Sequence, residues 1–388
     1  MMKPIAIVSG YLVGNPVGGH VLSILHYLAG LKKLGYDVVF VERFEWSNRC
    51  YNPRTGVRSD DPSDGIAEIT GYFRELGLGR LCYVDMNGEY RGVSQPEMTR
   101  LCGESAFLMS LWTVTWLEEF MECKKRIFID LDPGFTQFAM LPTPSRSTPW
   151  YASPLDYDVR FSYGTRIGKA DCPIPTHGLD WLPTRPPIAL ELLPVRYTPD
   201  APYFSTVMSW SNRKPIVYEG VEYGQKNVEF WRVAKLPSGL GPIFEIALAG
   251  DNVPREEIAA AGWHIVDPRE VTATIWAYRE YIAQSKGEFS VAVNLCVRSR
   301  NGWFSDRTAA YLASGKPVIV QDTGFSESLP CGEGLLAFTT LDEAAAAIEN
   351  VQRDYAHHCK AARQIAEAYF DSDKVLGDVL KASRVPLN

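Results

Sequence analysis

The sequence predicts an α/β protein built from two Rossmann-like domains, each with a doubly wound parallel sheet. First, the chain has 388 residues, which exceeds the size at which a single hydrophobic core stops growing. Second, it opens with a strand–loop–helix–strand pattern typical of a parallel sheet. Third, a proline-rich stretch from 142 to 203 separates two runs of alternating strands and helices.

The first forty residues carry the opening pattern. Ile5–Ser9 is a short apolar strand, followed by a glycine-rich loop and by leucines at helical spacing up to Leu34. Gly35 fits the end of that helix, and residues 37–42 form the next strand. Further strands are expected at 79–85, 106–111, 126–130 and 159–163.

The second half repeats this alternation. Strands are expected at 216–219, 243–249, 263–266, 289–294, 317–321 and 335–338. Helices are expected at 227–233, 341–351 with Thr340 as its N-cap, 354–369 and 372–382. We therefore place one domain at 1–190, a linker near 185–202 and a second domain at 203–364. The helices in 365–388 are expected to pack back on the first domain.

Bulk properties exclude several classes of protein. The net charge of −7 disfavours a general nucleic-acid binder, which would normally be basic. The 8 cysteines form no CxxC pair and no zinc-binding spacing with histidine, which favours a reducing, cytoplasmic location. We find no signal-peptide pattern and no apolar run long enough for a membrane span.

Residues 302–325 are predicted to bind a diphosphate. A helix begins after Ser305, and its free N–H groups and positive dipole suit a pyrophosphate at the carboxyl edge of a sheet. Gly302 would let a ligand approach the backbone. Guanidinium groups that suit phosphate oxygens are Arg298, Arg300 and Arg307.

Two alternatives remain open for this segment. The loop can be an ordinary solvated one, with its arginines paired to Asp306 or Glu327. Asp306 also argues against a phosphate, because an acid in the first helical turn repels an anion. It would instead accept hydrogen bonds from sugar or ribose hydroxyls.

The run Ala-Ala-Tyr-Leu-Ala-Ser-Gly-Lys-Pro-Val-Ile-Val, which ends at Val320, resembles the donor-side helix and strand of GT-B glycosyltransferases. Residues 302–334 are similar to bacterial family-4-like members. The resemblance implies two domains that face a cleft, the first binding an acceptor and the second a nucleotide sugar. One position departs from the pattern: many GT-B enzymes hold the ribose with a glutamate where this chain has Ala310.

The resemblance and the chemistry together give a donor-binding set. Asp322–Gly324 follow a strand where GT-B enzymes contact the sugar, although Asp-Thr-Gly is equally a turn. Lys226 would reach a phosphate, or is a surface lysine. The predicted donor-binding residues are Ser209, Lys226, Arg298, Arg300, Gly302, Trp303, Ser305, Asp306, Arg307, Asp322, Thr323 and Gly324.

The loop before the first helix lacks the dinucleotide pattern G-x-G-x-x-G. With Gly18, Gly19 and His20, it resembles the acceptor loop of GT-B enzymes. Gly18 and Gly19 would then bind the acceptor, and His20 would act as general base on its hydroxyl. A histidine at a helix start can also simply pack there.

Asp130 and Asp132 end a strand at the same sheet edge. They would orient His20 or contact the acceptor, and we therefore predict them as catalytic residues. Asp-Pro-Gly is also a turn signal. Two acids could suggest Mg²⁺, but the resemblance implies no metal.

These inferences predict a metal-independent hexosyltransferase that moves a sugar from a nucleoside-diphosphate sugar to an acceptor hydroxyl, with inversion. The co-substrate would be a UDP- or TDP-sugar, with no separate cofactor. The acceptor would be a small molecule or a glycan, and nucleic acid is disfavoured. Two alternatives are a nucleotide-sugar 2-epimerase of the same fold and a non-catalytic nucleotide-sugar-binding protein.

Overall fold

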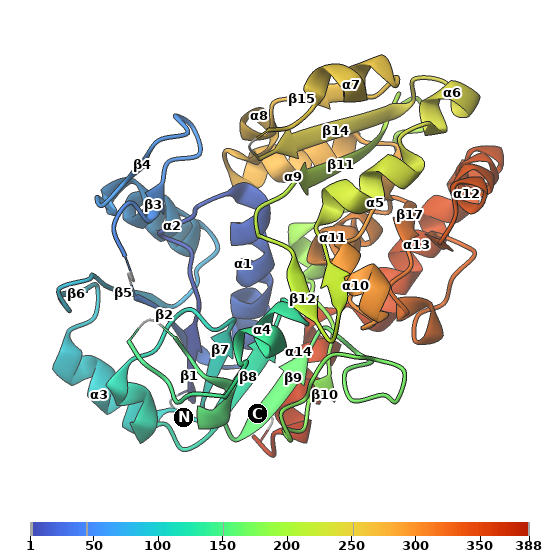
Figure 1. The fold of residues 1–388 in the computed structure, drawn as a ribbon. Helices are drawn as coiled ribbons and strands as arrows, with labels where there is room; N and C mark the ends of the chain where they lie inside the picture. Colours follow the sequence, from blue (N-terminus) through green and yellow to red (C-terminus); the bar gives the residue numbers. More distant parts are fainter. Residues whose placement is uncertain (1–2, 44–45, 150, 251, 387–388) are drawn as a thin grey trace.

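The computed structural model describes residues 3–43, 46–149, 151–250 and 252–386, which form two α/β domains (Figure 1). The first sheet has 8 strands in the order β10-β9-β8-β7-β1-β2-β5-β6, parallel except for the β5–β6 pair. Its strands are β1 (Ile5–Ser9), β2 (Asp37–Arg43), β5 (Arg80–Val84), β6 (Tyr90–Arg91), β7 (Phe107–Leu111), β8 (Arg126–Asp130), β9 (Val159–Ser162) and β10 (Leu182–Pro183).

Helices cover both faces of this sheet because its buried strands are apolar on both sides. Ala6 and Val8 of β1 face α1 and α2, whereas Ile7 faces α3. The helical segments of this domain are α1 (Gly18–Lys33), α2 (Ser63–Glu75), α3 (Gln95–Glu104), α4 (Phe135–Ala139) and the short 3₁₀ turns at Glu118–Glu122, Pro154–Asp156 and Leu190–Leu192. A small antiparallel pair, β3 (Cys50–Tyr51) and β4 (Arg58–Ser59), lies outside the sheet.

The second sheet has 6 parallel strands in the order β15-β14-β11-β16-β17-β18. They are β11 (Phe204–Ser209), β14 (Phe244–Ala249), β15 (His264–Val266), β16 (Gly287–Ser290), β17 (Val318–Gln321) and β18 (Leu335–Phe338). The helical segments are α5 (Lys226–Val233), α6 (Leu236–Leu240), α7 (Arg255–Ala260), α8 (Pro268–Thr272), α9 (Ile275–Gln284), α10 (Asn294–Ser299), α11 (Asp306–Ala313), the 3₁₀ turn Phe325–Glu327, α12 (Leu341–Arg353), α13 (Tyr355–Tyr369) and α14 (Ser372–Ala382). The predicted fold class of two doubly wound parallel sheets is confirmed.

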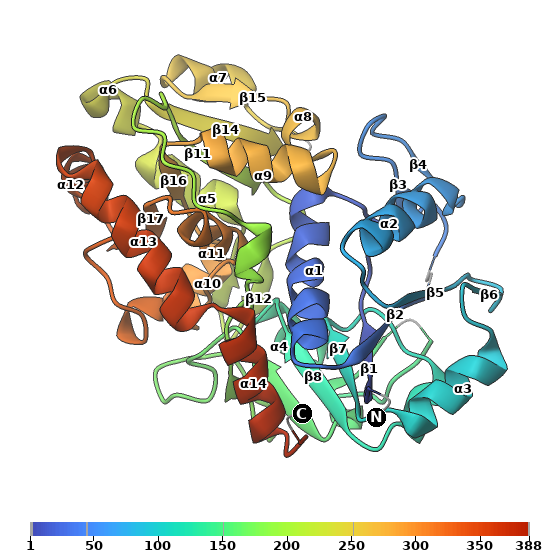
Figure 2. The same cartoon turned by 180° about the vertical axis from the view of Figure 1, so that it is seen from behind.

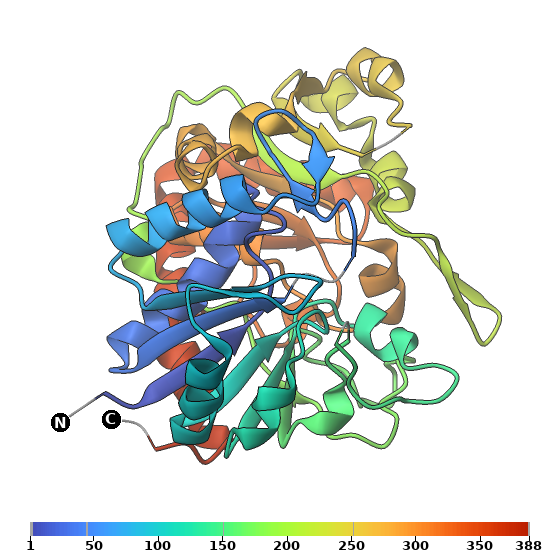
Figure 3. The same ribbon diagram turned by 90° about the vertical axis from the view of Figure 1, so that its left-hand side faces the viewer.

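The first strand of the second sheet was predicted at the wrong place. Residues 216–219 do not begin the sheet, because β12 (Ile216–Tyr218) pairs antiparallel with β13 (Val221–Tyr223) in a hairpin that projects from the domain (Figure 3). The sheet begins with β11. The sequence does not indicate this strand because two of its buried residues, Ser205 and Thr206, are polar. Ser205 is accommodated in the core because its hydroxyl lies 2.7 Å from the Tyr311 hydroxyl.

Two helix boundaries show how well local signals predict structure. Thr340 caps α12 as predicted: its side chain accepts a hydrogen bond from the Glu343 N–H, and Glu343 reciprocates in a capping box. The strand predicted at 289–294 is too long, because β16 ends at Ser290 and α10 begins at Asn294.

Helix α1 lies at the junction of the domains and packs against both α9 and α14 (Figure 2). The chain crosses between the domains twice. The two crossings lie side by side, because the Ile188 N–H donates to Phe370 O at 2.6 Å and the Ser372 N–H donates to Ile188 O at 2.9 Å. After the second crossing, α14 covers the first domain, and Leu376 of this helix is fully buried. No helix in the described ranges is both long and apolar enough to cross a membrane.

The junction brings main chain close to main chain at glycines. A Cβ on Gly18 would lie 2.2 Å from the carbonyl oxygen of Thr274, at the start of α9. No real Cβ tolerates such a contact, so any side chain at Gly18 would push the two domains apart.

We predict that Gly18→Ala lowers the free energy of unfolding by about 1–3 kcal/mol, as expected for overpacking a tight contact. Gly71→Ala is the control, because Gly71 lies inside α2 with nothing within 4 Å of an added Cβ. That change should stabilise the protein by about 0.5–1 kcal/mol. Equal effects of both changes in denaturant unfolding would contradict the proposed contact.

Candidate functional site

The carboxyl edges of the two sheets meet at the junction, where Arg213 of the second domain contacts the first domain. This residue follows β11 of the second domain, and its guanidinium donates to Asp132 Oδ2, just after β8 of the first domain, at 2.9 Å. The same guanidinium lies 4.3 Å from the centre of the Phe135 ring. Sequence reasoning missed Arg213 because it missed the strand that precedes it.

The glycine-rich loop after β1 is held by an internal carboxylate. Glu42, at the end of β2, accepts hydrogen bonds from the backbone N–H groups of Leu12 (2.6 Å), Val13 (2.6 Å) and Gly14 (2.8 Å). Glu42 is 1% exposed, and burial raises its pKa, although the three N–H donors oppose that rise. These three N–H groups of the loop are therefore bonded to Glu42 and do not face a bound phosphate. This agrees with the absence of the dinucleotide pattern from the loop.

His20 stands in an aromatic cluster at this edge. Its Nε2 lies 2.6 Å from Tyr11 O, and since a carbonyl oxygen only accepts, Nε2 carries the proton and Nδ1 keeps its lone pair. The imidazole stacks on the Tyr11 ring at 4.3 Å and lies 5.2 Å from the Trp112 ring. Burial lowers the pKa of His20 to about 4, so the ring is neutral at pH 7.

The two glycines predicted to bind the acceptor have another role. Gly18 is buried against Thr274, and a Cβ on Gly19 would lie 3.0 Å from the ring of Tyr278 in α9. Both glycines therefore allow the domains to pack closely. Their direct contact with an acceptor stays a prediction.

The two aspartates differ sharply. Asp130 is fully buried, and its carboxylate accepts from Thr136, Gln137 and Ser162 at 2.6–2.9 Å. Burial raises its pKa to about 6 despite these donors. Asp132 is half-buried and pairs with Arg213. Among the described residues neither carboxylate bonds His20, so their predicted role of orienting this ring is corrected: the carbonyl of Tyr11 orients it.

In the second domain, Gly302 and Gly324 also serve the junction. A Cβ on Gly302 would lie 2.3 Å from Thr165 Oγ1, and one on Gly324 would lie 2.7 Å from the Arg166 side chain, both in the first domain. The close approach predicted for a ligand at Gly302 is thus made by the protein itself. Arg166 strengthens the contact, since its Nε donates to Arg300 O at 2.9 Å and its guanidinium pairs with Glu327.

The three arginines predicted to hold phosphate are all engaged within the protein. Arg298 donates to Glu222 O at 2.9 Å, and Arg300 pairs with Glu327 at 3.2 Å. Arg307 donates to Glu288 at 2.6 Å, and also to Val207 O and the Ser290 hydroxyl. Although burial disfavours its charge, the fully buried Glu288 raises the pKa of Arg307. Arg307 is thus part of a buried ion pair, and its role as a phosphate ligand stays a prediction.

The start of α11 is where the diphosphate was expected. Ser305 takes the N-cap position as predicted, but its hydroxyl caps no helical N–H group. Asp306 lies in the first turn, and burial raises its pKa, with Arg307 and the N–H groups of residues 306–307 opposing the rise. The carboxylate of Asp306 therefore accepts hydrogen bonds from N–H groups at the helix start, where a phosphate was predicted to bind.

Lys226, the first residue of α5, lies beside this helix start. Its ammonium is half-buried within electrostatic reach of Arg307, Glu288 and Asp306, yet it forms no hydrogen bond or ion pair within the described part of the chain. Burial, followed by the Arg307 charge, lowers the pKa of Lys226 to about 7. A buried ammonium without a partner is costly, and an anionic ligand would relieve that cost.

The remaining predicted donor residues line or support this region. Thr323 is buried and donates to Trp303 O at 2.6 Å, whereas Asp322 closes a turn by accepting from the Gly324 and Ser326 N–H groups. The turn interpretation of Asp322 is thus the one the contacts support. Ser209 is the exposed last residue of β11. A hollow of about 20 Å³, room for about one water, is lined by Trp303, Ser305, Arg307 and Thr323 among others.

A buried network that sequence reasoning missed positions Lys226. Glu229 is fully buried and accepts from Asn294 at 2.5 Å and from Gln321 at 2.6 Å. Asn294 in turn accepts from the Gly224 N–H at 2.8 Å. The network joins the start of α5 to the ends of β16 and β17. Its polar residues are scattered over a hundred positions, so no local motif signals it.

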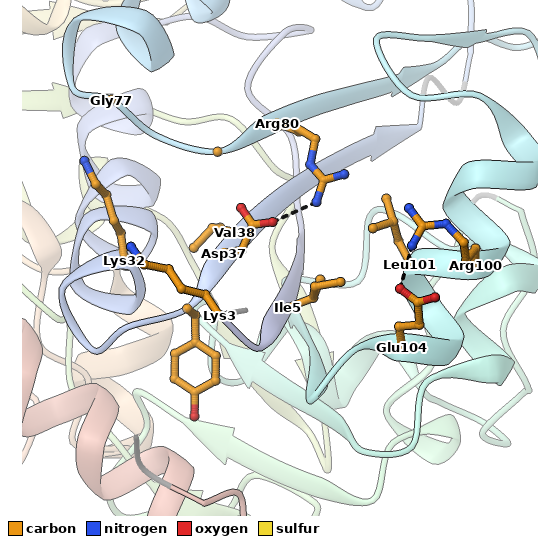
Figure 4. Close-up of a pocket in the computed structure, with 12 residues that line it drawn as sticks. Lys3, Ile5, Lys32, Asp37, Val38, Gly77, Arg80, Arg100, Leu101 and Glu104 are labelled. Atoms are coloured by element: carbon orange, nitrogen blue, oxygen red, sulfur yellow. Dashed lines mark hydrogen bonds and ion pairs between the residues drawn. The ribbon is translucent and has the colours of Figure 1, made fainter. Parts of the chain in front are cut away.

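A second hollow, of about 640 Å³, lies at the opposite, amino edge of the first sheet (Figure 4). Its charged side chains largely satisfy one another: Arg80 pairs with Asp37 at 2.9 Å and Arg100 with Glu104 at 2.5 Å. It is remote from the junction, and we assign it no function. Over the described residues, no group of three His, Cys, Asp or Glu side chains is arranged to hold a metal ion.

We predict that Arg307→Gln lowers the free energy of unfolding by about 3–5 kcal/mol, because it leaves the buried Glu288 carboxylate without its partner. Arg298→Gln is the control, since Arg298 is exposed and bonds only a carbonyl. It should change stability by about 0.5 kcal/mol or less. If Arg307→Gln unfolds like the wild type in denaturant, the ion pair has no structural role and Arg307 is free for a ligand.

Comparison with known proteins gives a fold but no sequence relative: no protein-family model and no curated protein sequence matches the chain. Three solved structures are similar over nearly the full length of both chains. An α-glucosyltransferase bound to UDP-glucose and DNA with an abasic site has a TM-score of 0.60 at 10% identity, covering 98% of this chain and 99% of that one.

Anabaena HepE bound to UDP-glucose has a TM-score of 0.56 at 11% identity, with 98% and 99% covered. Sucrose-phosphate synthase from Thermosynechococcus elongatus has a TM-score of 0.51 at 13% identity, with 99% and 98% covered. These structural neighbours are GT-B glycosyltransferases. Together with the two facing parallel-sheet domains, they show that this chain has the GT-B fold.

Proposed function

We propose that the protein is a glycosyltransferase that moves a sugar from a nucleoside-diphosphate sugar to an acceptor hydroxyl. The observation that carries the proposal is Lys226, a half-buried ammonium without a partner in the described residues, at the carboxyl edge of the second sheet. Ligands of open α/β sheets bind at that edge. Structures similar to this one are bound to UDP or UDP-glucose, which supports a uridine nucleotide as the donor.

In this proposal the ammonium of Lys226 binds the diphosphate, and Asp306 accepts hydrogen bonds from sugar or ribose hydroxyls. The Glu229 network fixes the start of α5 and with it the lysine. Arg213, Arg300 and Arg307 form ion pairs within the protein, so in this proposal the half-buried Lys226 supplies the main positive charge for the leaving diphosphate. No metal ion is part of the proposed mechanism.

We predict that Lys226→Met weakens UDP binding about 10–100-fold, through loss of a charge-assisted hydrogen bond. The unliganded variant should be at least as stable as the wild type, because an unpaired buried charge is removed. Lys235→Met, at an exposed lysine just after α5, should bind UDP normally. The measurement is calorimetric titration with UDP, alongside thermal unfolding.

The pKa of Lys226 adds a second readout to that experiment. At pH 8 the free lysine is mostly neutral because its pKa is about 7, and a bound diphosphate would raise that pKa. Wild-type protein should therefore take up a proton on binding UDP at pH 8, and its affinity should fall as the pH rises above 7. Titrations in buffers of different ionisation enthalpy measure this uptake. If Lys226→Met binds UDP as tightly and with the same uptake, Lys226 is not the phosphate ligand.

We propose that His20 is the general base on the acceptor hydroxyl and that transfer inverts the anomeric carbon. The support is its position: the neutral ring has a lone pair on Nδ1, and its other nitrogen is fixed by Tyr11 O at the edge of the first sheet. A base with a pKa near 4 is weak, so it acts by removing the proton as the new bond forms.

We predict that His20→Ala lowers the transfer rate about 10²–10⁴-fold while UDP affinity stays within about twofold. His264→Ala is the control, because His264 is exposed and pairs with Glu245 far from the junction. The rate is measured by UDP release, and the product's anomeric configuration by NMR. Retention of configuration, or normal turnover by His20→Ala, would rule out His20 as this base.

A further inference from the structure

Arg49 lies beside the His20 cluster and forms no ion pair with any residue that the structure describes. It lies just before β3, half-buried, and its guanidinium sits 4.8 Å from the centre of the Tyr11 ring and 4.7 Å from that of Trp46. Within the described residues, the guanidinium forms no hydrogen bond and no ion pair. Its five N–H donors are therefore available to a ligand.

The acids that the structure describes around Arg49 form no ion pair with it. Glu42, which lies within electrostatic reach of Arg49, accepts from three backbone N–H groups. On the loop that follows, Asp60 accepts from the Asn48 N–H and Asp61 accepts from Ser63. Arg54, on the same loop, does have a partner, because it pairs with Glu68 at 3.1 Å. A half-buried guanidinium that bonds none of the described residues can donate to a negatively charged ligand.

The surrounding rings fix where this ligand would lie. Tyr11 contacts Arg49 and His20, and its ring centre lies 5.1 Å from that of Trp112. Trp112 directly follows β7 and has a φ of 64°, a left-handed conformation that is costly for a bulky residue and is concentrated at functional sites. Trp46 is 50% exposed. Tyr11 thus connects Arg49 with His20, the proposed base, within one aromatic cluster.

We propose that the acceptor is a small molecule that carries an oxyanion, a carboxylate or a phosphate monoester, and that Arg49 binds this group. The inference rests on the proposed function, since it names the acceptor of that transfer. A planar guanidinium held against two rings is pre-organised to bind an oxyanion with two parallel hydrogen bonds. A single arginine suits one anionic group, whereas nucleic acids are bound through several phosphates and several cations.

The test uses two matched pairs of probes, with UDP at saturation. The carboxylate pair is 4-hydroxybenzoate and its methyl ester, and the phosphate pair is glucose 6-phosphate and glucose. Binding is measured by calorimetry and transfer with UDP-glucose. The wild type should bind the acid of one pair at least tenfold more tightly than its neutral partner, and the pair that shows this identifies the oxyanion.

Arg49→Gln should reduce that preference to within about twofold, and Arg49→Lys should keep part of it, since a lysine retains the charge without the fork. Arg54→Gln, the matched control, should keep the full preference. No preference in the wild type, including no binding of either acid, overturns the proposal. So does an Arg49→Gln variant that loses stability but keeps the preference, which would mean that Arg49 only balances the charge of Glu42.

Two further readouts separate this inference from the proposed function. If UDP binds and UDP-glucose is slowly hydrolysed, but the acids have no advantage, only the acceptor class is wrong. If UDP itself neither binds nor raises the melting temperature, the glycosyltransferase proposal fails. A duplex DNA oligonucleotide that binds more tightly than both acids, with Kd rising steeply with salt, would overturn the small-molecule acceptor.

Discussion

The site depends on one physical constraint, the contact of the two domains at positions where no side chain fits. Gly18 meets the Thr274 carbonyl, Gly134 meets Leu295, Gly302 meets Thr165, and Gly324 meets Arg166. At these points an added Cβ would lie 2.2–2.7 Å from the other domain. The contacts bring the carboxyl edges of both sheets together, so that Asp132 reaches Arg213 and His20 stands near the second domain. Without these glycines the site residues would belong to two separate surfaces.

Charge at the junction is arranged mostly in pairs. Arg307 is neutralised by Glu288, Arg166 by Asp171 and Glu327, and Arg213 by Asp132. The carboxylate of Glu42 occupies the glycine-rich loop after β1, and such a loop could otherwise bind an anionic ligand. Lys226 and Arg49 differ from these residues, because within the described ranges neither charged group forms a hydrogen bond or an ion pair. This distribution is what a two-substrate reaction between anionic molecules needs, because charges that are already paired contribute little to binding a ligand.

The sequence predicts elements better than it predicts contacts. Local signals suffice for the βαβ opening, for α14 at 372–382 and for the Thr340 cap, because propensity and capping are properties of neighbouring residues. They fail at β11, whose buried Ser205 needs a partner, Tyr311, more than a hundred residues away. The predicted site has the same limit: Arg307 resembles a phosphate ligand until Glu288 is placed against it, and Gly302 resembles a ligand loop until Thr165 fills the space. Lys226 was predicted as a donor-binding residue or a surface lysine, and only the fold shows that its ammonium is half-buried and unpaired among the described residues.

The paired crossings between the domains have a mechanical consequence. Ile188 and Asp371 lie side by side in an isolated parallel bridge, so the two crossings are joined at one point rather than independent. A motion that separated the crossings would break both hydrogen bonds of Ile188. A motion that kept the crossings together would keep these bonds, and would let the same glycines return to the same contacts.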